Sequence, residues 1–387
     1  GIGRFVVHNL IRQFAAEKLN RHPALKAAVQ ERYGRYYTYL LTQREKDMMG
    51  SEMLTARQEI RQEIHQVRTA LDWIILNWDH PPVINVLKAL LVYYAVDVWY
   101  DGVITFKHLA QWKRARLQET EAGAPSVNPI VLCSRVHQAF LLTNLGQIDE
   151  SEAISRACLP HLQASGLNAA YSECLHNLGV NASFRGEYQR AKSLLEQACV
   201  LGRESGYVLW PTYLLWLGHV YFLLGEYQQG LLSLQKCYDI FQQNGTLWGA
   251  AFALSKMGLA SDGLGQHVRA MHYHQEALTV FEQIQNRCGK GYCLSRMSMS
   301  ACFLGEYQQA RAISERACDL FEEIGHRWGI STSLSRMGFA DIGLGQIDSA
   351  KEMFIQALQL SKQEKMLPLC LYALAGLACT MLVSGAE

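Results

Sequence analysis

Small and apolar residues return along this chain at a fixed interval of about 40 residues. Leu254, Met257 and Gly258 form one such set, and residues of the same kind stand 40 and 80 positions later. This spacing places the apolar side chains on one face of a helix, and the small residue lets a neighbouring helix approach closely. The pattern therefore predicts one amphipathic helix in each period.

A glycine follows each of these helices, and the phrase "LGEYQQ" occurs twice, at 224–229 and 304–309. Glycine can adopt the left-handed conformation that ends a helix. A second helix is expected after each turn, because alanines such as Ala270 and Ala277 recur two helical turns apart. A further glycine-containing break, for example "QNRCGKG" at 285–291, is expected to close the unit. The turn glycines are Gly146, Gly186, Gly225, Gly265, Gly305, Gly345 and Gly385, and Gly102 fits loosely upstream.

The unit is thus a helix–turn–helix of about 40 residues, stacked at least six times. One unit cannot bury its apolar face alone, so the period predicts an all-α, right-handed superhelical solenoid. The pattern resembles tetratricopeptide repeats over residues 129–387, with Leu254, Met257, Gly258, Ala270 and Ala277 at the signature positions. The usual unit has about 34 residues, so longer helices are expected here.

The residues before 129 predict helices over about 24–48 and 52–78, a helical pair over 82–117 and a loop at 119–129. "VVHNLIRQFAAEKL" (6–19) resembles the end of the winged-helix module of bacterial STAND (NB-ARC-type) signal-transduction ATPases, and "QVRTALDW" (66–73) resembles the helical arm that follows it. The resemblance implies a winged-helix remnant at 1–20, an arm with a degenerate repeat at 21–128, and the repeat superhelix at 129–387.

The same resemblance implies that His8 contacts the phosphates of bound ADP in the resting full-length protein. Asn9 stands where the family has an aspartate, which weakens any role that needs an acid. The ADP- or ATP-binding module would lie upstream. No G-x-x-x-x-G-K-[ST] motif occurs in this sequence, so the chain itself is not expected to bind or hydrolyse nucleotide.

Composition narrows the functional classes. The formal net charge is +1, without the strongly basic balance of a nucleic-acid-binding protein, so no direct nucleic-acid partner is expected. No apolar run is judged long enough to span a bilayer, so no membrane partner is expected. The eleven cysteines include no C-x-x-C pair and suggest small buried thiols in a reducing cytoplasm. His272 and His274 point about 200° apart on a helix, so no metal site is expected. No catalytic set can be nominated, and the chain is not expected to be an enzyme.

The concave surface is the expected binding site, because the first helix of each tetratricopeptide unit lines the groove. Its outward positions are aromatic, weakly polar and poor in charge, which suits a peptide, a protein surface or a small amphipathic ligand. These positions are His176, Leu215, His219, Phe222, Phe252, Ser255, Leu259, Tyr292, Ser295, Met299, Phe303, Thr332, Ser335 and Phe339.

Three cations, Lys256, Arg296 and Arg336, recur at intervals of 40 and should form a ladder along the groove. They are either solvated or ion-paired with acidic neighbours such as Asp262 and Asp341, or they anchor carboxylates or phosphates of a ligand.

These features together predict the sensor region of a STAND-type ATPase and bacterial regulator, whose groove binds an inducer or protein and controls an upstream nucleotide switch. The alternative is a constitutive protein-interaction scaffold that does not switch. A helical-repeat enzyme would need clustered titratable residues in the groove, and the sequence offers none.

Overall fold

The computed structural model of this protein describes residues 9–78, 82–95, 98–117 and 128–385. Within these ranges the regular structure is entirely helical. The helices predicted over 24–48 and 52–78 and the helical pair at 82–117 are confirmed. His8 and most of the expected loop at 119–129 lie outside the described residues. The N-terminal helices are α1 (Asn9–Asn20), α2 (Pro23–Asp47), α3 (Met53–Asn77), α4 (Pro82–Tyr94) and α5 (Trp99–Arg116).

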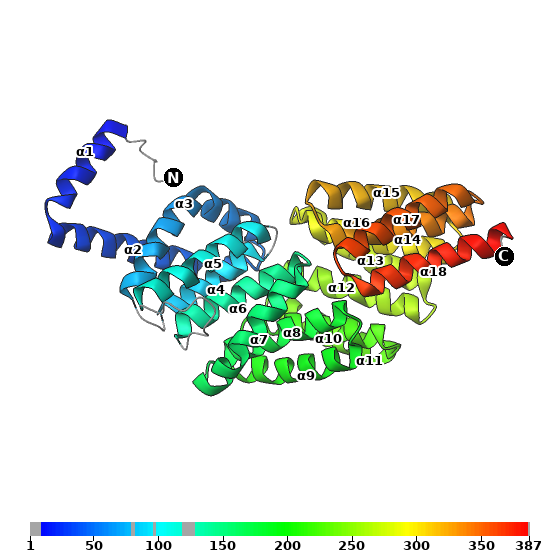
Figure 1. The fold of residues 1–387 in the computed structure, drawn as a ribbon, viewed down its shortest axis with the longest axis horizontal. Coiled ribbons are helices and arrows are strands. Elements are labelled where there is room, and N and C mark those ends of the chain that lie inside the picture. Colours follow the sequence, from blue (N-terminus) through cyan, green and yellow to red (C-terminus); the bar gives the residue numbers. More distant parts are fainter. Residues whose placement is uncertain (1–8, 79–81, 96–97, 118–127, 386–387) are drawn as a thin grey trace.

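The remainder is an array of antiparallel helix pairs, as the 40-residue period predicts. The paired helices are α6 (Pro129–Asn144) and α7 (Ile148–Ser165), α8 (Asn168–Phe184) and α9 (Tyr188–Glu204), α10 (Pro211–Leu223) and α11 (Tyr227–Gln243), α12 (Leu247–Gly263) and α13 (His267–Gln283), α14 (Arg287–Phe303) and α15 (Tyr307–Glu323), and α16 (Arg327–Gly343) and α17 (Ile347–Gln363). The helix α18 (Leu367–Ser384) follows α17 in the position of another first helix. Figure 1 shows this α-solenoid curving, so that α15–α18 lie opposite α7–α11.

The turn after each first helix depends on glycine, as expected. Gly225 and Gly305 have φ values of 77° and 80°, a conformation that glycine adopts without strain. In the turn between α13 and α14, however, Gln285 holds the left-handed conformation, with φ 53°. The expectation of a glycine break in "QNRCGKG" is therefore wrong in detail, because Gly289 and Gly291 lie inside α14. A side chain at either position would clash, because the ring of Phe281 packs against Gly289 and that of Phe321 against Gly291.

The small residues within the helices allow the close packing that their spacing predicts. A Cβ atom added at Gly218 would lie 2.6 Å from Leu234 Cγ on the following helix. Gly102, which loosely matched the turn pattern, lies inside α5 instead. A Cβ atom there would lie 2.5 Å from Leu141 Cδ1, so this glycine serves the contact between α5 and α6.

The apolar core crosses the boundary proposed at residue 128. One cluster of buried side chains extends from Tyr37 in α2 to Tyr213 in α10. The helices α4 and α5 pack against α6, so the arm continues into the first repeat. In contrast, α1 projects from the body at the blue end of the chain (Figure 1), with Leu10, Ile11 and Phe14 exposed.

The last helix corrects one expectation. Leu367–Ser384 is 18 residues long with a mean hydropathy of 1.9, so by length and composition α18 could cross a membrane. The expectation that no apolar run reaches this length is therefore wrong. The small residues Ala373 and Gly376 of α18 are buried in the array, with Gly376 against Phe354 of α17, while Leu371 and Leu374 are exposed.

Candidate functional site

The curvature of the array brings its two ends into contact. Lys365, in the turn between α17 and α18, has its Nζ 2.7 Å from Oδ2 of Asp149 at the start of α7. Deeper in the contact, the ring centroids of Phe184 and Trp328 lie 4.6 Å apart with the rings edge to face. The superhelix therefore closes on itself within the length of the described repeats.

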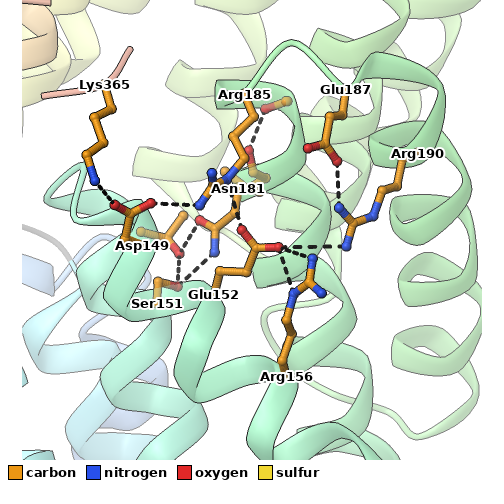
Figure 2. Close-up of polar contacts among 12 residues, drawn as sticks. Asp149, Ser151, Glu152, Arg156, Asn181, Arg185, Glu187, Arg190 and Lys365 are labelled. Carbon is orange, nitrogen blue, oxygen red and sulfur yellow. Dashed lines mark hydrogen bonds and ion pairs between the residues drawn. The ribbon is translucent and has the colours of Figure 1, made fainter. Parts of the chain in front are cut away.

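A network of ion pairs surrounds this closure (Figure 2). Asp149 accepts hydrogen bonds from Lys365 and from Nη2 of Arg185, both at 2.7 Å. These partners, Lys365 first, lower the pKa of Asp149 below its usual value. Glu152 is contacted by Arg156, Arg185 and Arg190 at 2.6, 2.9 and 3.7 Å. The acidic residues at this edge are thus paired with cations of the chain itself.

A cavity of about 500 Å³ lies between the closed ends and the inner helices. This volume falls in the range of sites that bind small molecules. The lining of the cavity is largely aromatic on the side of the first helices and charged at the closure. Residues that line it include Trp99, Phe140, Asp149, Glu150, His176, Phe184, Arg185, Leu215, Trp216, His219, Trp248, Phe252, Lys256, Cys288, Tyr292, Arg296, His326, Trp328, Glu364 and Lys365.

The helix period explains how the first helices build this wall. On α12 the residues Trp248, Phe252 and Lys256 are spaced by four, so they lie above one another on one helix face. Cys288, Tyr292 and Arg296 occupy the same places 40 residues later on α14, and these six residues line the cavity. Each repeat therefore contributes a short column of side chains.

The structure divides the expected groove residues into two groups. His176, Leu215, His219, Phe252, Lys256, Tyr292 and Arg296 line the cavity. The remaining expected residues, Phe222, Ser255, Leu259, Ser295, Met299, Phe303, Thr332, Ser335, Arg336 and Phe339, are not among its lining residues. Phe303 is 56% exposed and stacks on His267. Phe339 packs against Phe354 and Tyr372, about three helical turns along α16 from Trp328, the residue of this helix that lines the cavity.

The expectation that the cation ladder is solvated or ion-paired is wrong. Lys256, Arg296 and Arg336 are only 6%, 8% and 9% exposed. The expected acidic partners are engaged elsewhere: Asp262 contacts His267 and Ser300, and Asp341 contacts Arg311 and Ser349.

Each member of the ladder instead reaches back to the preceding repeat. Arg296 and Arg336 donate through Nη1 to Ser255 and Ser295, at 2.6 and 2.5 Å. Lys256 contacts Trp216, which stands 40 residues earlier at the same place in the repeat. The Lys256 ammonium lies 4.4 Å from the centre of the Trp216 ring. Ser255 and Ser295, which were predicted to line the groove, therefore accept hydrogen bonds from the arginines and do not line the cavity.

Neutral histidines contribute to the aromatic wall. His176 is stacked between Phe140 and Tyr213, and burial lowers its pKa to about 4. His326 accepts a hydrogen bond from the backbone N–H of Gly329 and lies 3.1 Å from the hydroxyl of Tyr292. Burial also lowers the pKa of His326 to about 4. Neither ring is expected to carry charge at neutral pH.

The expectations from sequence missed Trp99, Trp216, Trp248, His326 and Trp328. Trp248 and Trp328 stand 80 residues apart in "TLWG" and "HRWG", so their shared place in the period was a usable signal. Trp99 and the residues of the closure come from other parts of the array. The local pattern of one repeat holds no information about them.

Comparison with known proteins agrees with the repeat architecture. Tetratricopeptide repeat models match residues 172–205 and 211–244. No curated protein matches the sequence. The chain is a tetratricopeptide-like repeat protein with the fold of an α-solenoid.

Several solved structures share this fold. A Rap protein complexed with Competence and Sporulation Factor is 10% identical, with a TM-score of 0.56 over 91% of this chain and 98% of that chain. NprR in complex with its cognate peptide NprX is 13% identical, with a TM-score of 0.52 over 74% of this chain and 81% of that chain. A STAND protein with a tetratricopeptide repeat sensor from Pyrococcus horikoshii is 14% identical, with a TM-score of 0.49 over 84% of this chain and 50% of that chain. The chain spans about half of the length of that STAND protein.

Proposed function

We propose that this chain is the ligand-sensing region of a STAND-type ATPase and that its cavity binds a short peptide or a small molecule. The observation that carries the proposal is the closure of the array around a cavity of about 500 Å³. The walls come from α6–α8 at one end and from the turn between α17 and α18 at the other. A ligand held there contacts both ends of the superhelix at once.

Two proteins that share the fold support ligand binding by such an array. The Rap protein and NprR were each solved in complex, the first with Competence and Sporulation Factor and the second with its cognate peptide NprX. The aromatic lining of the present cavity suits apolar side chains or rings, because such surfaces combine large contact area with few rotatable bonds.

Sensing requires that the ligand binds one conformation more tightly than another. In this proposal the closed array, marked by the contact of Lys365 with Asp149, is one state and an opened array is the other, since only the closed array surrounds a ligand. By resemblance, an upstream module would carry ADP or ATP, and His8 would contact the phosphates in the resting state. In this proposal the protein is cytoplasmic, and the ATPase chemistry belongs to the upstream module.

The test uses the full-length protein purified from its native host. Native mass spectrometry should detect a bound peptide or small molecule. Adding this ligand back to protein from which it has been removed should accelerate the exchange of ADP. A bound ligand that leaves ADP exchange unchanged would favour the constitutive scaffold. A protein that carries no ligand and binds none from a fractionated host extract would contradict the proposal.

A further inference from the structure

Cationic side chains line the cavity in two places, at the closure and on the inner wall, and only those at the closure are paired with a carboxylate in the described part of the chain. Arg185 and Lys365 both pair with Asp149 at the closure. Lys256 and Arg296 line the opposite wall, and within the described residues no carboxylate lies within 4 Å of either side chain. Two basic side chains therefore face the same space without a carboxylate beside them in the described part of the chain.

Lys256 is the less satisfied of the two. Its ammonium rests against the ring of Trp216 and makes no hydrogen bond in the part of the chain that the structure describes. An ammonium group has three N–H donors, and a ring face substitutes poorly for three acceptors. Arg296 donates to Ser255 through Nη1, and its guanidinium lies 5.4 Å from the centre of the Tyr292 ring.

The surroundings make this arrangement costly. Lys256 and Arg296 are 6% and 8% exposed, and a buried charge without a partner lowers the stability of the folded state. Burial, and then the neighbouring Arg296, hold the pKa of Lys256 well below its usual range. The nearby His219 has a pKa lowered well below its usual value by burial and then by these two cations, so its ring is neutral at neutral pH and offers them no counter-charge. A ligand that brings an anion into this wall would remove the cost.

We infer that Lys256 and Arg296 form an oxyanion subsite that holds a carboxylate or phosphate attached to an aromatic ring. Trp248, Phe252 and Tyr292 line the same wall and supply the faces for the ring. At the closure Arg185 and Lys365 already pair with Asp149, and Glu150 and Glu364 line the cavity beside them, so an anion is attracted less to this end than to Lys256 and Arg296. This inference rests on the proposed function, since it describes how the same cavity recognises its ligand.

The subsite is tested with simple probes by isothermal titration calorimetry on the whole chain. Benzoate and phenyl phosphate carry the two oxyanions, and benzamide and phenol are their neutral counterparts. We expect each anion to bind roughly tenfold or more tightly than its neutral counterpart, because a charge-assisted hydrogen bond contributes more than a neutral one. The relative affinities of the two anions separate a carboxylate site from a phosphate site.

Lys256→Met and Arg296→Met are expected to weaken anion binding by roughly tenfold or more each. Lys236→Met is the matched control, because Lys236 is exposed on α11 and does not line the cavity. If Lys256 only stabilised the fold, its replacement would lower the melting temperature. We expect instead that Lys256→Met preserves or raises the melting temperature of the ligand-free protein.

Three results would overturn the inference: equal affinity for the anions and their neutral counterparts, unchanged binding in Lys256→Met, or no binding of either anion at millimolar concentration. A ligand found by native mass spectrometry would still support the proposed function in each case. The two ideas therefore fail on different measurements.

Discussion

Lys365 Nζ lies 2.7 Å from Asp149 Oδ2, although 216 residues separate the two in the sequence. The side chains are 77% and 56% exposed. An exposed ion pair contributes at most about 1 kcal/mol. This pair therefore marks where the superhelix closes, while the half-buried rings of Phe184 and Trp328 are better placed to hold it closed.

The closure predicts different results for two substitutions. Lys365→Ala should leave the radius of gyration in small-angle X-ray scattering nearly unchanged. Trp328→Ala should increase it, because the edge-to-face contact with Phe184 is lost. Trp328→Phe is the control, since it keeps a ring at this position. An unchanged radius of gyration in Trp328→Ala would show that the rings do not hold the ends together.

The buried histidines predict a loss of stability on mild acidification. Burial lowers the pKa of His176 to about 4, below the usual value near 6.5. Between these values the unfolded chain binds a proton that the folded chain excludes, so stability is complete above about pH 6.5 and falls as the pH is lowered toward 4. The slope is about 1.4 kcal/mol per pH unit for each such histidine.

Thermal denaturation between pH 7 and 5 measures this slope. His274 and His326 also have pKa values lowered to about 4, so their effects add to that of His176. His176→Phe keeps the stack between Phe140 and Tyr213 and should reduce the pH dependence. An identical slope in His176→Phe would mean that this histidine does not contribute.

The second turn of the repeat predicts a pair of opposite effects. Gln285 has φ 53°, while Gly325, at the same place one repeat later, has φ 66°. A left-handed conformation is unfavourable for residues other than glycine, so Gln285→Gly should stabilise the protein by up to about 1 kcal/mol. Gly325→Gln should destabilise it by about 1–2 kcal/mol. Urea denaturation gives both values, and effects of the same sign would contradict the assignment of strain.

A buried network in the first repeats predicts a large effect. Glu173 is fully buried, 2.8 Å from Nδ1 of His137, and it accepts a short hydrogen bond from the hydroxyl of Tyr207. Glu173→Ala should destabilise the protein by about 3–5 kcal/mol, because it leaves both partners buried without their acceptor. Tyr207→Phe removes one hydrogen bond and should cost about 1–3 kcal/mol. Equal effects in urea denaturation would argue against a shared network.

The periodic sequence predicted most of the fold, because the relevant interactions are local. Gly225 ends a helix, and Gly218 admits Leu234 of the next one. Both requirements concern neighbouring helices, so spacing in the sequence is enough to reveal them. The same reasoning failed at Gly289, where a glycine serves ring packing and not a turn.

The candidate site was predicted only in part for the same physical reason. The period placed Phe252, Lys256, Tyr292 and Arg296 on the inner faces of their helices, and these residues do line the cavity. The repeat pattern cannot say how far each unit rotates on the next, and small rotations add up along a superhelix. That sum decides that Lys365 meets Asp149 and that the cations of the inner wall are buried without a carboxylate beside them in the described part of the chain. Phe303 and Phe339 lie away from the cavity because they stand toward the C-terminal ends of α14 and α16, beyond the residues of these helices that line it.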